Sequence, residues 1–241
     1  MCTVSVIALP DLLRLVSNRD ERRTRPTALP PSLSSINGAQ ILSPTDPASG
    51  GTWIASNDAG LAIALLNVNL SASGSQGPPR SRGDIVPGLI GHRSLDDVAK
   101  AAAAIDTRLY APFRLVAVQA GVGDVVELIP STRTTRRASL AVPQMFTSSG
   151  LGDARVEAPR RELFEDTVIR AGSSDWRAGQ DRFHSHRWAD RPEVSVWMSR
   201  GDAWTVSRTV VEIGGREIVM RYAAEPDWID RPAYLARLSA G

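Results

Sequence analysis

Short apolar runs joined in pairs by tight-turn residues are the feature that most restricts the fold of this 241-residue chain. Pro10-Asp11 separates two such runs near the N-terminus, and Gly214-Gly215 separates two near the C-terminus. Turn residues of this kind favour short connections between antiparallel strands rather than crossover helices. The sequence therefore predicts antiparallel sheets built from hairpins. The expected strands are residues 3–9, 12–17, 52–56, 61–67, 113–119, 125–129, 193–199, 203–213 and 216–224.

Two segments between these strands have helical features. Ser94 and Asp97 have the spacing of a capping box, and the alanines that follow favour a helix through Asp106. Residues 159–171 have apolar positions at helical spacing. Two polar segments rich in proline, glycine or serine are expected to be loops, residues 18–35 across one end of the first hairpin and residues 71–84 as a surface loop or lid.

The composition is that of a folded chain with a sizeable core. Hydrophobic residues make up 42% of the chain and charged residues 22%, which excludes a largely disordered protein. We expect residues 1–241 to form a single domain of the α+β class. No apolar run approaches the roughly 20 residues that a membrane helix needs, and the start lacks the features of a signal peptide. We therefore expect no membrane span and a cytoplasmic location.

Charge and histidine spacing do not favour nucleic-acid or metal binding. The formal net charge is only +2, and the basic stretch at residues 131–139 lacks interleaved aromatic residues, so a solvated loop is expected there. His184 and His186 would share one face of a strand. No third ligand lies at a familiar spacing, and the surrounding residues are basic. We expect no metal site and no nucleic-acid partner.

Cys2, the only cysteine, directly follows the initiator methionine. Removal of Met1 would make Cys2 the first residue, and its own α-amino group could then accept the thiol proton. If the first two strands form a hairpin, Arg19 and Asp20 come close to this residue. Asp20 could then hold the α-ammonium group, and Arg19 could favour the thiolate or bind a substrate carboxylate. The alternatives are an inert terminal cysteine and a solvated charged turn.

Several motifs in the first 90 residues carry a family resemblance. They are Met-Cys at the start, Asn-Arg-Asp-Glu at 18–21 followed by Arg-Pro at 25–26, Gly-Gly-Thr-Trp at 50–53, Ala-Leu-Leu-Asn at 64–67 and Arg-Gly-Asp-Ile-Val at 82–86. Together they resemble the NRDE family, also called the Transport and Golgi organisation type. The resemblance implies the fold of N-terminal nucleophile hydrolases, a four-layer αββα sandwich with antiparallel sheets, similar to that of penicillin V acylases and bile-salt hydrolases.

The resemblance also implies roles for individual residues. Cys2 resembles the nucleophile and Asp20 the acidic partner of its amine, while Asn67 lies where an amide could donate to an oxyanion. Arg19 is the fourth candidate catalytic residue. The candidate substrate-binding residues are Asn18, Arg82 and Asp153, the last at a position where many family members have a Ser-Asn pair.

These features predict a cysteine amidohydrolase that acts on a small-molecule amide and needs no cofactor. The alternative is a non-catalytic protein that uses the same cleft to bind haem or an acyl lipid, with Cys2 as an axial ligand or a relic. A third possibility is a structural or partner-binding protein. The fold alone does not decide among them.

Overall fold

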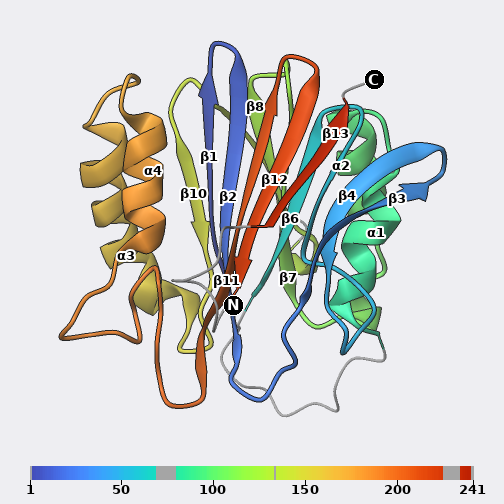
Figure 1. Cartoon of the computed structure of the whole chain (residues 1–241). Coiled ribbons are helices and arrows are strands. Elements are labelled where there is room, and N and C mark those ends of the chain that lie inside the picture. The colour runs from blue at the N-terminus through green and yellow to red at the C-terminus, as the bar shows by residue number, and fades with distance from the viewer. Residues whose placement is uncertain (1, 69–79, 133, 225–233, 240–241) are drawn as a thin grey trace.

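The computed structural model describes residues 2–68, 80–132, 134–224 and 234–239. Two antiparallel sheets stand face to face, each with a pair of helices on its outer side (Figure 1). The first sheet has the strand order β10-β1-β2-β11-β12-β13. Its strands are β1 (Cys2–Leu9), β2 (Leu12–Arg22), β10 (Gln144–Thr147), β11 (Ala203–Gly214), β12 (Glu217–Ala224) and β13 (Tyr234–Ser239).

The second sheet follows the chain order from β3 to β9. Every neighbouring pair of strands in it is antiparallel. Its strands are β3 (Leu29–Ile36), β4 (Ala39–Thr45), β5 (Ile54–Asn57), β6 (Leu61–Asn67), β7 (Phe113–Gln119), β8 (Asp124–Ile129) and β9 (Thr134–Ser139).

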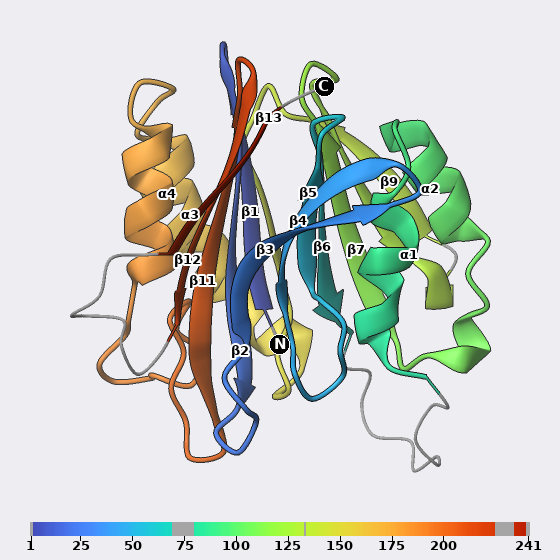
Figure 2. The ribbon, with the colours of Figure 1, turned by 45° about the vertical axis from the view of Figure 1, so that its right-hand side comes forward.

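Helices complete the outer two layers. α1 (Ile85–Ile90) and α2 (Leu95–Ala103) cover the second sheet, while α3 (Asp153–Phe164) and α4 (Trp176–Ser185) cover the β10-β1-β2 side of the first (Figure 2). A π-helical segment, Glu165–Ile169, continues α3. The predicted cap of α2 is present, since the Ser94 hydroxyl accepts from the Asp97 backbone N–H at 3.1 Å. None of the helices within the described ranges is long and apolar enough to cross a membrane.

The core is divided by the sheets. Residues such as Val4, Leu15 and Leu66 pack between the two sheets, whereas Ile7, Phe164 and Phe183 pack between the first sheet and its helices. Period-two alternation along the strands sends successive side chains to these two layers. The predicted four-layer αββα arrangement and the antiparallel hairpins are therefore confirmed.

Two predicted segments are wrong in their secondary structure. The expected loop at residues 18–35 is largely strand. β2 pairs with β1 as far as Arg19 and with β11 as far as Arg22, and β3 begins at Leu29. The expected strand at 193–199 is instead a set of turns in which Pro192 accepts backbone bonds from Ser195 and Ser199. Its apolar side chains are buried, and Val196 packs in the cluster between the first sheet and its helices.

Other corrections concern the ends and the edges. The histidine pair belongs to the last turn of α4 and its end rather than to a strand, and the expected loop at 131–139 contains edge strand β9. The helix expected at 159–171 begins earlier, at Asp153, and contains Pro159 within it. The helix after Ser94 ends at Ala103. Residues 71–79 of the proposed lid lie outside the described residues, and Arg82–Asp84 form a turn of 3₁₀-helix.

Candidate active site

Cys2 is the first residue of β1, which lies between edge strand β10 and β2 in the first sheet. It pairs with Arg19 of β2, and its carbonyl accepts from the backbone N–H of Ser148 just after β10, at 2.9 Å. Cys2 also shares its face of β1 with Val4 and Val6, which pack between the sheets. Its side chain is therefore held in the layer between the two sheets and is only 5% exposed.

A cavity of about 320 Å³ lies beside Cys2 and is lined from both sheets and from the loops at their ends. We call the polar residues around it the cavity cluster. It comprises Cys2, Arg19, Asp20, Glu21, Arg25, Asp46, Ser49, Thr52, Trp53, Asn67, Arg80, Ser81 and Arg82. Three of the four predicted catalytic residues come from the β1–β2 hairpin, and Asn67 faces them from the end of β6.

Arg19 is fixed by contacts on two sides. Its guanidinium bonds a carboxylate oxygen of Asp46 at 2.7 Å and lies 4.2 Å from the ring centroid of Trp53. Arg25 bonds the same carboxylate at 2.7 Å, and Glu21 lies 3.5 Å from both arginines. These ion pairs fix the positions of Arg19 and Arg25, and the carboxylates of Asp46 and Glu21 offset their positive charge beside the cavity.

Asp20 is buried and accepts a hydrogen bond from the Thr205 hydroxyl at 2.6 Å. Burial raises the pKa of Asp20, while the Arg160 cation and the Thr205 bond act in the opposite direction. Because its pKa is raised, Asp20 can take up a proton at a higher pH than an exposed aspartate would. Thr205 is its register partner on β11, so sheet pairing sets this contact.

Burial also raises the pKa of the Cys2 thiol. The Asp20 carboxylate raises it further, and Arg19 and the Asp20 backbone N–H lower it. The resting thiol is therefore neutral near pH 7 and needs a base to become a nucleophile. The nearest such group would be its own α-amine, and the Cys2 nitrogen already donates to the Ser148 hydroxyl oxygen at 3.1 Å.

Arg160 is a buried cation that the sequence reasoning missed. Its guanidinium donates to the hydroxyls of Thr3 and Thr147 and to the carbonyls of Val194 and Ser195, at 2.6 to 3.0 Å. Burial lowers its pKa, and Asp20 and Cys2 raise it. Arg160 is thus an electrostatic neighbour of Cys2 and Asp20.

A signal for Arg160 was present in the sequence. Val156, Arg160 and Phe164 recur at intervals of four and form the buried stripe of α3. An arginine in an apolar stripe at helical spacing is a candidate for a buried, functional cation.

The predicted residues Asn67 and Arg82 both line the cavity. Arg82 donates to the Pro112 carbonyl at 2.9 Å, and no carboxylate lies within ion-pair distance of it among the described residues. Burial lowers its pKa, while Cys2 and Glu21 raise it. The loops that contain Gly51 and Gly83 lie so close together that a Cβ at Gly51 would stand 2.2 Å from the Gly83 carbonyl oxygen. This close approach accounts for the second glycine of the Gly-Gly-Thr-Trp motif.

Trp53 of the same motif also lines the cavity and is 7% exposed. Its indole Nε1 is buried and has no hydrogen-bond partner among the described residues. A buried unpartnered donor costs free energy, so this N–H is a candidate donor to a ligand that reaches it from the cavity.

Two predicted substrate-binding residues do not line this cavity. Asn18 faces α4, where its amide donates to the carbonyls of His184 at 2.8 Å and Val196 at 3.1 Å. Asp153 begins α3 and accepts from the backbone N–H of Ser149 at 2.8 Å. Strand alternation turns Asn18 away from the layer that holds Arg19, and Asp153 instead supports the turn that carries Ser148. Both side chains thus position neighbouring elements rather than line the site.

His184 and His186 make no metal centre in the described part of the chain, where no group of three or more potential ligands occurs. His184 is enclosed between the Ser5 hydroxyl at 2.7 Å and the Asn18 side-chain oxygen at 3.1 Å. Burial holds the pKa of His184 well below its usual value of 6.5. The imidazole is therefore neutral and occupied by its own chain.

The first 164 residues match the family described as Transport and Golgi organisation 2. The chain belongs to this family. The match covers every predicted catalytic residue and confirms the family suggested by the motifs. No curated protein matches the sequence.

Solved structures of N-terminal nucleophile hydrolase type share the fold of this Transport and Golgi organisation 2 family member. Penicillin V acylase from Agrobacterium tumefaciens is 13% identical, with a TM-score of 0.56 over 99% of this chain and 86% of that one. A Caenorhabditis elegans ortholog of N-acylethanolamine-hydrolyzing acid amidase is 11% identical, with a TM-score of 0.61 over 98% and 100%. A mutant conjugated bile acid hydrolase from Clostridium perfringens is 10% identical, with a TM-score of 0.55 over 99% and 92%.

Proposed function

We propose that this protein is an N-terminal cysteine amidohydrolase that acts on a small-molecule amide once Met1 has been removed. The observation that carries the proposal is the position of Cys2. The only thiol of the chain lies at the start of β1, an interior strand of the first sheet, and lines a cavity between the two sheets, beside Arg19 and Asp20. The amidohydrolases named above share this fold, which supports the reaction class.

In the proposed reaction, the free α-amine of Cys2 takes the thiol proton and the sulfur attacks the amide carbon. The carbon–nitrogen bond then breaks, and the leaving amine receives that proton. Water then gives a proton to the same α-amine and its oxygen bonds the thioester carbon. The carbon–sulfur bond breaks, which releases the carboxylic acid, and the α-ammonium returns the proton to the sulfur. The thiol is thereby restored, and the cycle needs no cofactor.

The surrounding residues would support these steps. The Ser148 hydroxyl, already bonded to the Cys2 nitrogen, would orient the α-amine. Asp20 would balance the α-ammonium charge, and Asn67 would donate to the oxyanion. Trp53 supplies a second donor that is buried and unpartnered in the described structure.

The charge of the cavity favours a substrate that carries an anionic group. Arg19 and Arg25 are already paired with Asp46, whereas Arg82 bonds only a neutral carbonyl among the described residues. A half-buried guanidinium of this kind gains most from a ligand carboxylate. We therefore propose a carboxylate-bearing amide as the preferred substrate class.

The haem- or acyl-lipid-binding alternative fits the cavity less well. A thiolate is the form that ligates iron, yet burial and Asp20 raise the pKa of the Cys2 thiol. The lining also contains four arginines and three carboxylates, whereas sites for haem or acyl chains are predominantly apolar. Absence of a Soret shift on haem titration at micromolar protein would count against this alternative.

The test combines intact mass with amine release from a panel of acyl amides. We expect Met1 to be absent from the mature protein, and Cys2→Ala to abolish turnover. A matched control inserts one serine between Met1 and Cys2, which keeps the thiol but removes the α-amine from it. Turnover that survives this insertion, or retention of Met1 in an active protein, would exclude the N-terminal nucleophile mechanism.

A further inference from the structure

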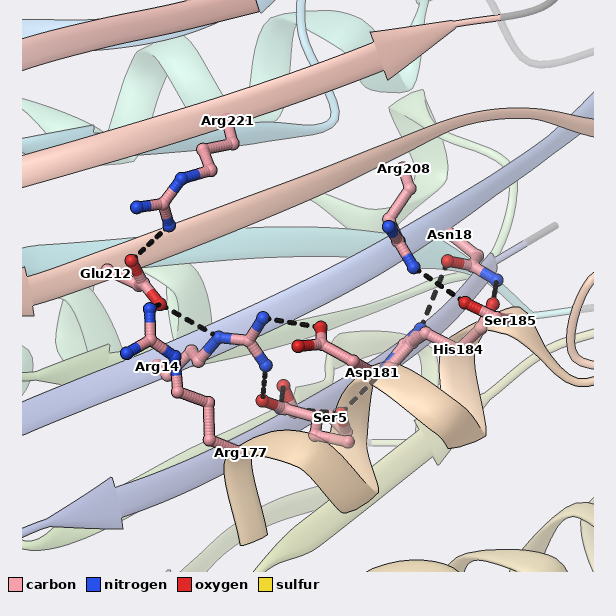
Figure 3. Close-up of polar contacts among 11 residues, drawn as sticks. Ser5, Arg14, Asn18, Arg177, Asp181, His184, Ser185, Arg208, Glu212 and Arg221 are labelled. Carbon is pink, nitrogen blue, oxygen red and sulfur yellow. Dashed lines mark hydrogen bonds and ion pairs between the residues drawn. The ribbon is translucent and has the colours of Figure 1, made fainter. Parts of the chain in front are cut away.

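A second polar site lies on the outer face of the first sheet, away from Cys2. Strands β11 and β12 extend beyond α4, and the step between helix and strands forms a groove of about 440 Å³. We call it the arginine groove. Its polar lining is Arg14, Arg177, Asp181, Ser185, Arg208 and Arg221 (Figure 3).

Strand register and the packing of α4 gather these arginines from four elements. Arg14 of β2 lies opposite Glu212 of β11, and Arg208 and Arg221 follow on β11 and β12. Arg177 reaches the same place from the first turn of α4. Side chains that are remote in sequence therefore converge on one surface.

Arg14 is held by the protein through all three of its guanidinium nitrogens. Its three guanidinium nitrogens bond Glu212 at 3.1 Å, Gln180 at 2.6 Å and Asp181 at 2.6 Å, and its side chain is 4% exposed. It forms the floor of the groove and joins α4 to the sheet. Its positive charge therefore lies at the floor of the groove.

Arg177 and Arg221 share one carboxylate, that of Glu212, with Arg14. Glu212 bonds Arg177 at 2.8 Å and also bonds Arg221, in addition to Arg14. Arg177 and Arg221 are about half exposed, and each engages Glu212 through one nitrogen. Donors on both side chains are therefore left for a ligand.

Arg208 adds a fourth cation at the other end of the groove, where it donates to the Ser185 hydroxyl at 2.9 Å. Burial lowers the pKa of Arg208, Asp181 raises it, and the neighbouring Arg14 cation lowers it. With Asp181 and Glu212 as the two carboxylates among these residues, the groove keeps an excess of two positive charges.

We propose that the arginine groove is a binding site for a phosphomonoester group. A phosphomonoester carries a charge of about −1.5 to −2 at pH 7, which matches the excess charge of the groove. Planar guanidinium groups form paired hydrogen bonds to phosphate oxygens, and several converge here. The site is separate from the proposed hydrolytic reaction and does not depend on it.

The first test uses inorganic phosphate as the probe and the full-length protein. Sodium phosphate is titrated against the arginine side-chain N–H resonances, with sodium chloride at equal ionic strength as the reference. We expect saturable shifts of the groove arginines in phosphate only. Arg177→Gln and Arg208→Gln should each weaken phosphate binding about tenfold, the effect of losing one charge-assisted contact.

Arg170→Gln is the matched control, because Arg170 is an exposed arginine paired with Asp166 away from the groove. This variant should bind phosphate as the unchanged protein does, and so should Cys2→Ala. Equal shifts in chloride, or equal loss of affinity in Arg170→Gln, would overturn the proposal. Arg177 is exposed, so its variant keeps the test valid if Arg208→Gln fails to fold.

A second arm identifies the source of the phosphate group. Vesicles of phosphatidylcholine with and without phosphatidic acid are sedimented with the protein. Sedimentation that requires phosphatidic acid, is reversed by phosphate and is lost in Arg177→Gln would support the groove with a lipid headgroup as its ligand. Phosphate binding without sedimentation would support it with a soluble phosphomonoester, whereas the absence of both would overturn it.

Discussion

The cavity cluster and the network on the helix side of the same hairpin are both buried and polar, but only one of them leaves groups for a ligand. We call the second region the helix-side network, made of Ser5, Asn18, Gln180 and His184 (Figure 3). In it, Gln180 donates to Ser5, and the Ser5 hydroxyl and Asn18 oxygen enclose His184. The donors and acceptors of this network are satisfied within the protein.

The cavity cluster differs in having a space beside it. Cys2, Asn67 and Arg82 line a cavity, and the Trp53 Nε1 beside them has no partner in the described structure. Shifted pKa values occur in both regions, in His184 as well as in Cys2 and Asp20. A buried, shifted group is therefore a candidate for chemistry only where the fold also leaves room for a reactant.

The sharpest test of this contrast is Cys2→Ala. We expect turnover of an acyl amide to fall by about 10⁴-fold or more, because the nucleophile is lost. The midpoint of urea unfolding should change little, because alanine removes only the thiol from this buried position. Residual turnover within tenfold of the unchanged protein would remove Cys2 from the mechanism.

Asn18→Ala should have the opposite signature. Two buried carbonyls and the His184 ring would lose their partner, at a cost of about 3 kcal/mol in the free energy of unfolding. Activity per folded molecule should remain. Urea titration beside an assay at low temperature measures both, and a specific loss of activity at unchanged stability would place Asn18 in the site after all.

Trp53→Phe separates packing from hydrogen bonding within the cavity cluster. Phenylalanine keeps a ring beside Arg19 but removes the unpartnered N–H. We expect kcat to fall about tenfold, the value of one donor to a substrate oxygen, with stability unchanged or slightly increased. If kcat is unchanged, the indole serves packing only.

Arg82→Gln should raise KM for carboxylate-bearing amides about tenfold and leave KM for neutral amides unchanged. The physical reason is the loss of the cation that has no protein carboxylate to bond in the described structure. Arg170→Gln serves as the charge-matched control. An equal increase in KM for both substrate types would show that Arg82 holds the loop and not the substrate.

The lowered pKa of His184 predicts that the free energy of unfolding, and not the catalytic rate, depends on the protonation of this residue. Its folded pKa lies below the unfolded value of about 6.5, so the unfolded chain takes up a proton that the folded chain does not. The contribution of neutral His184 to the free energy of unfolding should be fully present above pH 6.5. Below pH 6.5 the free energy of unfolding should decrease by at most about 1.4 kcal/mol per pH unit. Urea unfolding of the protein and of His184→Gln at pH 7.5 and 5.5 measures the difference, and equal slopes in both would contradict it.

Much of the fold could be predicted from local sequence because turn residues act locally. Pro10-Asp11 forms the turn between β1 and β2 as predicted. The predicted Gly214-Gly215 turn lies one residue later, at Gly215-Arg216, because Gly214 still pairs with Glu217 at the end of the β11–β12 hairpin. Residues 193–199 show the limit of this reasoning. Their alternation is that of a strand, but their backbone bonds form turns around Pro192, and only Ser199 at the end of the segment makes an isolated bridge to Trp204 of β11.

The candidate site could be predicted only in part for a similar reason. The hairpin brought Cys2, Arg19 and Asp20 together, and the family resemblance added Asn67 and Arg82, all of which line the cavity. Asn18 could not be assigned, since its motif position gave no information on which face of β2 it would occupy. Arg160 was missed because its partners Thr3, Thr147, Val194 and Ser195 lie on three separate segments.

The sequence by itself determined the antiparallel hairpins, the family and the placement of Cys2 next to an arginine and an aspartate. These features depend on neighbours along the chain or on a single turn. The tertiary structure alone decided which buried polar groups remain open to a ligand. Only the packing of two sheets and their helices determines whether a side chain meets a partner from the protein or a cavity.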